Sequence, residues 1–181
     1  MEQRFCQSCG MPLVELFLAA FAMAQERNYI SICGKTKTSI KWTEEHKSSN
    51  TNLSISLNNG IYSISGKFNG KQISKKVKSK GKPWYQNIAY NAGLTLKNGR
   101  SVEYECFRPD NIKLYTMSAA KKGTEKLDGK NAVRIEVSLT GFMSAFWSCD
   151  YYFDMSSLMF VGYKGVNGDP GTPETKISVA R

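Results

Sequence analysis

The sequence has little of the chemistry on which enzymes depend. It contains a single histidine, His46, among 181 residues. It has no phosphate-binding loop, dinucleotide fingerprint or G-x-S-x-G nucleophile elbow. A Ser-His or Cys-His nucleophile would have to use His46, which stands among Glu44, Glu45 and Lys47 in a stretch that we predict to be a solvated strand. We therefore expect a protein without catalytic activity.

Long apolar runs are also absent. No stretch approaches the roughly 18 to 20 apolar residues that cross a bilayer, so we predict no transmembrane helix. Residues 16–24 form a shorter apolar stretch that ends with the small residues Ala22 and Ala24 and is followed by the polar Gln25. This pattern is typical of a secretion signal with an A-x-A cleavage site. We expect cleavage near Ala24 and a periplasmic or secreted mature protein, the alternative being a short buried helix.

A second cysteine pair is missing as well. Cys6-Gln-Ser-Cys9 and the residues around it, 5–13, resemble half of a small family of bacterial zinc ribbons. A structural zinc site needs four ligands, normally from a second CxxC or a Cys/His pair, and the sequence has neither. We expect no cofactor, and Cys6 and Cys9 remain the candidate ligands if zinc is bound.

The remaining chain alternates apolar and polar residues, which predicts antiparallel strands. Residues 53–57, 102–106, 133–139 and 175–179 show this alternation most clearly. Turn dipeptides recur at Asn59-Gly60, Asn69-Gly70, Asn98-Gly99 and Asp128-Gly129. The helical candidates are 84–92 and 118–125. An open meander must bury its apolar face by curling, by covering it with a helix or by retaining a ligand, and the alternation does not choose among these.

The C-terminal half, about 83–179, resembles a family of uncharacterised bacterial exported proteins that we associate with the LolA-like lipoprotein carriers. The most specific motifs are Phe107-Arg108-Pro109-Asp110, Phe146-Trp147 with Asp150-Tyr151-Tyr152-Phe153, and residues 165–173. The resemblance implies a single curved antiparallel sheet, a half-barrel, with one or two short helices. It also implies export and, by analogy, an apolar ligand. We thus expect a signal-like segment over 1–24 and a single exported β domain over 25–181.

Large aromatic side chains are the candidates for such a ligand site. Trp147, Cys149, Tyr151 and Phe153 would share one face of a strand. The residues that we nominate for an apolar pocket are Tyr104, Phe142, Phe146, Trp147, Tyr151 and Phe153. A pocket for a lipid or lipoprotein acyl chain and ordinary core packing are both compatible with this pattern. Cys106 and Cys149 are expected in the core, either as buried thiols or as a disulfide bridge.

Charge is strongly one-sided, with a formal net charge of +10. Seven lysines lie between Lys67 and Lys82. They would protect a sheet edge against pairing with another chain or, alternatively, attract an anionic membrane surface. The run has no arginine and only Phe68 among its lysines, which disfavours a nucleic-acid partner.

Three functions follow as hypotheses. The first is an exported, non-catalytic protein that binds an apolar ligand such as a lipid or lipoprotein acyl chain. The second is a structural or interaction module with a filled core and no ligand. The third, which the missing ligands disfavour, is a zinc-ribbon protein that uses Cys6 and Cys9.

Overall fold

The structure is a computed structural model that describes residues 27–33, 38–90, 99–108, 111–166 and 174–178. Strands make up 69% of these residues, and the strands pair antiparallel in two sheets. The prediction of a mainly antiparallel β protein is therefore confirmed. The signal-like segment 1–24, with Cys6 and Cys9, lies outside the described residues.

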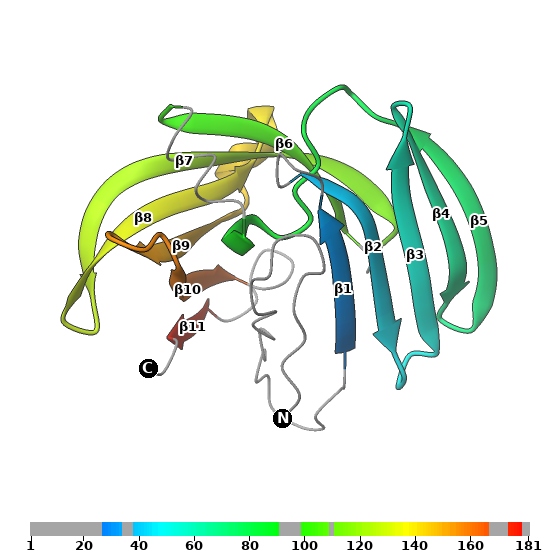
Figure 1. Cartoon of the computed structure of the whole chain (residues 1–181), viewed down its shortest axis with the longest axis horizontal. Helices are drawn as coiled ribbons and strands as arrows, with labels where there is room; N and C mark the ends of the chain where they lie inside the picture. Colours follow the sequence, from blue (N-terminus) through cyan, green and yellow to red (C-terminus); the bar gives the residue numbers. More distant parts are fainter. Residues whose placement is uncertain (1–26, 34–37, 91–98, 109–110, 167–173, 179–181) are drawn as a thin grey trace. The chain divides into compact units, whose positions relative to one another are not determined.

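The first sheet is a five-stranded meander in which each strand pairs with the next one along the chain (Figure 1). Its strands are β1 (Arg27–Cys33), β2 (Ser39–His46), β3 (Thr51–Asn58), β4 (Ile61–Phe68) and β5 (Lys71–Lys78). The hairpins turn at Asn59-Gly60 and Asn69-Gly70, as predicted, and all four residues have φ between 48° and 77°. Asn-Gly is suited to such turns because both residues tolerate positive φ.

The second sheet is a six-stranded meander, and its strands curve strongly (Figure 1). Its strands are β6 (Ser101–Arg108), β7 (Lys113–Leu127), β8 (Lys130–Leu139), β9 (Ser148–Asp154), β10 (Phe160–Val166) and β11 (Glu174–Ser178). Asp128-Gly129 forms the turn between β7 and β8, with φ of 47° and 81°. A short 3-10 helix, η2 (Gly141–Ala145), connects β8 to β9.

The expectation of a single sheet is corrected by this pairing. β5 ends at Lys78 and β6 begins at Ser101, and no strand pair joins the two sheets within the described residues. The connecting segment contains Lys80-Gly81-Lys82-Pro83, and proline lacks the N–H that a continuing strand would donate. The chain accordingly divides into two compact units, one up to Gln86 and one from Asn87. Whether they form one domain, as we expected for 25–181, stays a prediction.

The two helical candidates have different outcomes. Within 84–92, the described residues contain one short 3-10 helix, η1 (Ile88–Tyr90). The candidate at 118–125 is wrong, because these residues belong to β7, which pairs with β6 on one side and β8 on the other. Two neighbouring strands outweigh the weak helix preference of this segment. None of the described helices has the length and apolar character that a membrane span requires.

The inner face of the first sheet carries the apolar residues of that unit. Leu53 and Ile55 from β3 and Tyr62 and Ile64 from β4 are at most 1% exposed. Trp84, which follows β5, packs edge-on against Tyr62 with ring centroids 5.2 Å apart. The alternation of these residues with serines explains why one face is buried and the other is polar.

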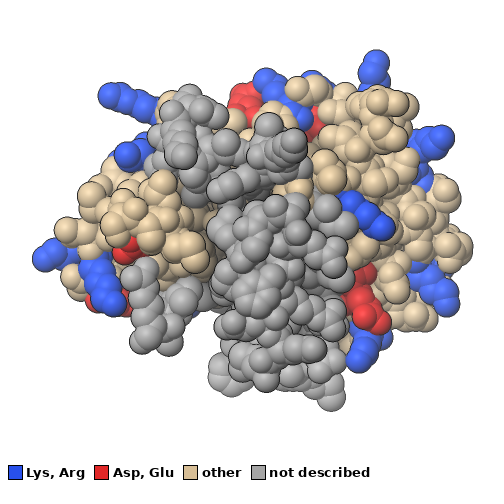
Figure 2. Space-filling view, viewed as in Figure 1, with Lys and Arg blue, Asp and Glu red and all other residues tan. Residues whose placement is uncertain are grey.

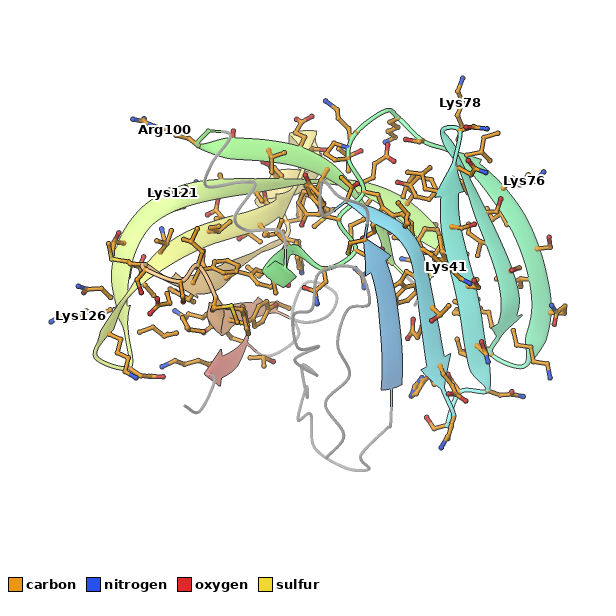
Figure 3. The ribbon with its side chains drawn as sticks, viewed as in Figure 1. Lys41, Lys76, Lys78, Arg100, Lys121 and Lys126 are labelled. Carbon is orange, nitrogen blue, oxygen red and sulfur yellow. The ribbon has the colours of Figure 1, made fainter. Side chains whose placement is uncertain are left out.

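The lysines near β5 lie at the edge of the first sheet. β5 pairs only with β4 within the described residues, and its lysines Lys71, Lys75, Lys76 and Lys78 are all exposed. In Figure 3, Lys76 and Lys78 project away from the ribbon. On the face of the molecule shown in Figure 2, basic side chains are seen more often than acidic ones.

Candidate functional site

The aromatic candidates form an inner and an outer group in the second unit. The inner group consists of Tyr104 on β6 and of Tyr151 and Phe153 on β9. Tyr104 is 3% exposed and Phe153 is 0% exposed, whereas Tyr151 is half-buried. Tyr151 and Phe153 share one face of β9, as predicted, because they alternate with Tyr152 in a regular strand.

Tyr104 and Tyr151 are close enough to affect one another electrostatically, although β7 and β8 lie between their strands. Burial raises the pKa of Tyr104 well above its usual range, and the neighbouring Cys106, Tyr151 and Cys149 raise it further. Burial is likewise the main reason for the raised pKa of Tyr151. Across a flat sheet these strands would be about 14 Å apart, since neighbouring strands are spaced by about 4.8 Å. The strand register places both rings on the same inner face, and the sheet curves strongly (Figure 1).

The inner group extends onto β10 through residues that sequence reasoning missed. Phe160 packs against Phe153 with ring centroids 6.1 Å apart, and Tyr163 packs edge-on against Tyr151 at 5.2 Å. Phe160 and Tyr163 are three residues apart, so regular alternation would place them on opposite faces. The register between β9 and β10 shifts between Phe160 and Gly162, which brings both rings to the same face.

The thiol of Cys149 is enclosed within this aromatic face. Burial raises its pKa to about 12, and its side chain is hydrogen-bonded to Tyr163. A Cβ added to Gly165 would lie 2.4 Å from the Cβ of Cys149, so there is no room for a side chain on β10 opposite this cysteine. Cys149 is a free cysteine, and β7 and β8 separate its strand from that of Cys106. No bridge joins the pair, so the structure supports the interpretation of free thiols, with Cys149 buried and Cys106 half-buried.

The outer group surrounds η2 and reaches the solvent. Phe142 is 83% exposed and Phe146 is 50% exposed, and their rings pack edge to face with centroids 5.3 Å apart. Trp147 is half-buried, and its indole N–H donates to the backbone oxygen of Val166 at 3.1 Å. The hydroxyl of Tyr163 donates to the same oxygen at 3.3 Å. The outer group is therefore connected to the inner one through Trp147, Val166 and Tyr163. Trp147 itself precedes β9, so its predicted place on the strand face is corrected.

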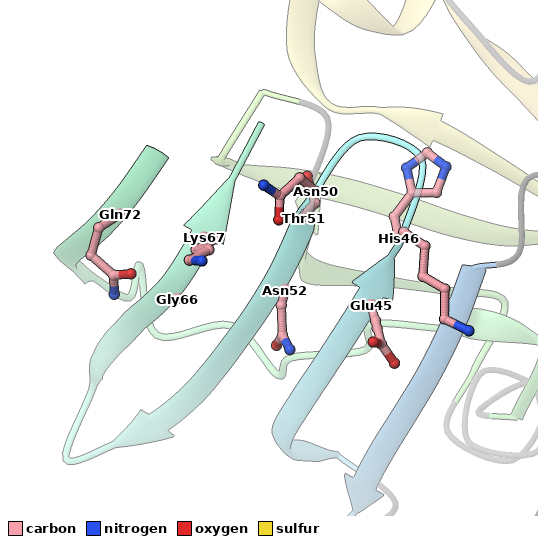
Figure 4. Close-up of a pocket in the computed structure, with 9 residues that line it drawn as sticks. Glu45, His46, Asn50, Thr51, Asn52, Gly66, Lys67 and Gln72 are labelled. Atoms are coloured by element: carbon pink, nitrogen blue, oxygen red, sulfur yellow. The ribbon is translucent and has the colours of Figure 1, made fainter. Parts of the chain in front are cut away.

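A polar pocket of about 470 Å³ lies on the first sheet. It is built around a row of side chains that crosses four strands, with Glu45, Asn52, Lys67 and Gln72 paired in register from β2 to β5 (Figure 4). Gly66 also contributes to the lining, as do residues of the turn between β2 and β3. A carboxylate, an ammonium group and two amides can together bind hydroxyl groups and anions.

Serine hydroxyl groups lie within hydrogen-bond distance of both ring nitrogens of His46. His46 is 6% exposed, so the prediction that it lies on a solvated strand is wrong. Its Nε2 is 3.0 Å from Ser48 Oγ and its Nδ1 is 2.8 Å from Ser49 Oγ. Ser49 Oγ donates in turn to Thr51 Oγ1 at 2.9 Å. These contacts fix the turn that borders the polar pocket.

Within the described ranges, no group of three or more His, Cys, Asp or Glu side chains could hold a metal ion. Comparisons with protein-family models, curated proteins and solved structures found no match for the chain. The resemblances to LolA-like carriers and to zinc ribbons remain predictions.

Proposed function

We propose that the protein is an exported, non-catalytic binding protein that holds an apolar ligand, such as a lipid or an acyl chain of a lipoprotein, against the inner face of the second sheet. The observation that carries the proposal is that the second unit has both an exposed aromatic pair at η2 and a cluster of buried rings on its inner face. Exposure falls from 83% at Phe142 and 50% at Phe146 to 3% at Tyr163 and 0% at Phe153.

Such a gradient favours an apolar ligand for a physical reason. Removing apolar surface from water contributes about 25 cal/mol per Å², so exposed rings at η2 gain free energy when an acyl chain covers them. The half-buried Tyr151 and Phe160 continue this apolar surface toward the buried rings of the sheet. Under this proposal, a ligand that enters beside Phe142 and Phe146 would extend toward these inner rings.

The proposed protein has no catalytic activity, and the properties of two side chains, His46 and Cys149, support this part of the proposal. His46 is only 6% exposed, so a substrate has little access to its ring. Cys149 has its pKa raised to about 12, so its thiol is protonated at neutral pH and is a weak nucleophile. These features support binding rather than covalent chemistry.

The alternative is a structural or interaction module whose second sheet is filled by its own side chains. It is favoured by the low exposure of Tyr104 and Phe153, which are 3% and 0% exposed. Under this alternative, Phe142 and Phe146 would serve as a contact for another protein and would bind no acyl chain.

Titration with a fluorescent long-chain fatty acid separates the two functions. We expect saturable binding by the wild-type protein and binding weakened about tenfold or more by Phe142→Ser combined with Phe146→Ser, because two apolar contacts are lost. Melting temperatures should stay close to wild type, since both rings are largely exposed. Ile40→Ser is the matched control, because Ile40 is 45% exposed on the first sheet. Absence of saturable binding by the wild-type protein would support the filled module.

A further inference from the structure

The outer face of the first sheet combines lysines with a strip of small hydroxyl side chains. Lys41, Ser56, Ser63 and Lys76 stand in register on four neighbouring strands, from β2 to β5. Both lysines are exposed, Ser63 is exposed and Ser56 is half-buried. The row therefore presents two hydroxyl groups between two cations, whose strands are about 14 Å apart at the usual strand spacing.

The next row along the sheet has the same character. Thr43, Ser54, Ser65 and Ser74 are in register and point to the same outer face. Beyond them lies the row of Glu45, Asn52, Lys67 and Gln72 that lines the polar pocket (Figure 4). Hydroxyl side chains thus occupy the middle of the first row and the whole of the second, and Lys41 and Lys76 stand at the two sides of the first row. The third row carries one basic side chain, Lys67, and one acidic side chain, Glu45, and the pocket lies at this end. We call these three rows the hydroxyl–lysine face.

Most of the positive charge of the chain belongs to this unit. Thirteen lysines and arginines against five acidic residues give +8 up to Gln86, whereas twelve against ten give +2 from Asn87 onward. In the part of the chain that the structure describes, Lys41 and Lys76 take part in no ion pair. Figure 3 shows Lys41 on β2 and Lys76 on β5. The face therefore attracts anions without an internal counter-charge at these positions.

We propose that the hydroxyl–lysine face binds an acidic polysaccharide, a sugar polymer that carries carboxylate or sulfate groups. Such a polymer offers hydroxyl groups along its length, which serine, threonine and amide side chains can bind as donors and acceptors. Its anionic groups match the lysines at the sides of the face. This inference is independent of the apolar ligand proposed for the second sheet.

Two other polyanions fit the face less well. Single-stranded nucleic acid binds on aromatic side chains that stack with its bases, and these three rows contain no aromatic residue. A lipid surface would gain attraction from the lysines, yet the rows contain no apolar side chain to enter it. Hydroxyl and amide groups, in contrast, are the ones that a polyhydroxylated chain requires.

Binding of sodium alginate, a polyuronate, to the full mature chain tests the proposal by calorimetry at low salt. We expect saturable binding that weakens as salt rises, with uncharged dextran as the inactive comparison. Lys41→Ala combined with Lys76→Ala should weaken binding roughly fivefold or more. Ser56→Val with Ser63→Val should also weaken binding, because the proposed contact uses both hydroxyl groups. A purely electrostatic contact would leave the affinity of this variant unchanged.

The matched control uses the neighbouring lysines of β5 that point to the other face. Lys75 pairs with the buried Ile64 and Lys71 with Phe68, so Lys71→Ala with Lys75→Ala removes the same charge without touching the outer face. We expect this variant to bind alginate within twofold of wild type. Equal losses in both lysine variants would overturn the proposal. So would tighter binding of single-stranded DNA or of phosphatidylglycerol vesicles than of alginate, the vesicle result supporting the membrane surface predicted from the sequence.

Discussion

At the scale of single residues, glycines allow two strands to approach where a side chain would not fit. Gly66 on β4 has φ of +127°, and a Cβ built on it would lie 2.0 Å from the backbone oxygen of Asn52 on β3. Gly123 in the bulge of β7 has a similar φ of +135° but no atom within 4 Å of the added Cβ. An added side chain would strain the backbone at both positions, but it would overlap with a neighbouring strand only at Gly66.

Gly66→Ala should destabilise the protein more than Gly123→Ala does. Both substitutions strain φ, but only the first pushes a Cβ against a backbone atom of the neighbouring strand. We expect Gly66→Ala to lower the free energy of unfolding by about 3 kcal/mol or more and Gly123→Ala by about 1 kcal/mol. Urea denaturation of both variants measures the difference. Equal losses would show that the close approach of Gly66 to Asn52 is absent.

Buried thiols make stability depend on pH in the alkaline range. Burial raises the pKa of both Cys106 and Cys149 from 9.0 to about 12. Because the pKa values are raised in the folded state, the contribution of the thiols to the free energy of unfolding is fully present below pH 9. It is lost as the pH rises toward 12, since the unfolded state then releases protons that the folded state retains.

We expect the free energy of unfolding to fall between pH 9 and 11, measured by denaturant titration under reducing conditions. Each fully titrating thiol contributes a slope of at most about 1.4 kcal/mol per pH unit. Cys149→Ala should make the fall less steep by up to that amount, whatever its effect at neutral pH. A slope identical to wild type would contradict the burial of Cys149.

At the scale of elements, the exposed edge of the first sheet is protected by a charge on its inner face. Lys75 of β5 lies on the same face as Ile73 and Val77, and it pairs with the buried Ile64. A charged side chain that points inward on an edge strand disfavours the addition of another strand.

Lys75→Val should therefore promote self-association, since β5 would then present three apolar side chains in succession on one face. We expect a concentration-dependent rise in mass by light scattering after size-exclusion chromatography. Lys76→Val removes the same charge on the outer face and should remain closer to the mass of wild type. If both variants associate equally, total charge rather than the direction of Lys75 protects the edge.

Some elements of the fold could be predicted from the sequence, and others could not. Alternation correctly located strands around 53–57, 102–106 and 133–139. It did not reveal that Glu105, on the side of its strand predicted to be polar, is 0% exposed. It could not reveal the register shift at Phe160, since a bulge depends on the neighbouring strand. Local sequence makes 118–125 a helical candidate because it carries no sign of the two strands that pair with β7. His46 was misplaced for a related reason, because polar neighbours gave no sign that serine hydroxyls enclose its ring.

At the scale of the whole molecule, the two units differ in the chemistry of their surfaces. The first carries most of the positive charge and a hydroxyl-rich outer face, and the second carries a curved aromatic face. The sequence predicted the strands of both units but not their division into two sheets, because alternation does not encode where pairing stops. The candidate aromatic residues could be nominated from their size and from strand alternation, whereas their division into exposed and buried groups required the structure.

Native mass spectrometry of the protein purified from the envelope of its host tests the central claim most directly. The account predicts a polypeptide that begins at Gln25 and carries an additional lipid mass, which the Phe142→Ser and Phe146→Ser double variant loses and the Ile40→Ser control retains. A folded wild-type protein isolated without any bound lipid, and unable to take one up on incubation with host lipids, would contradict it.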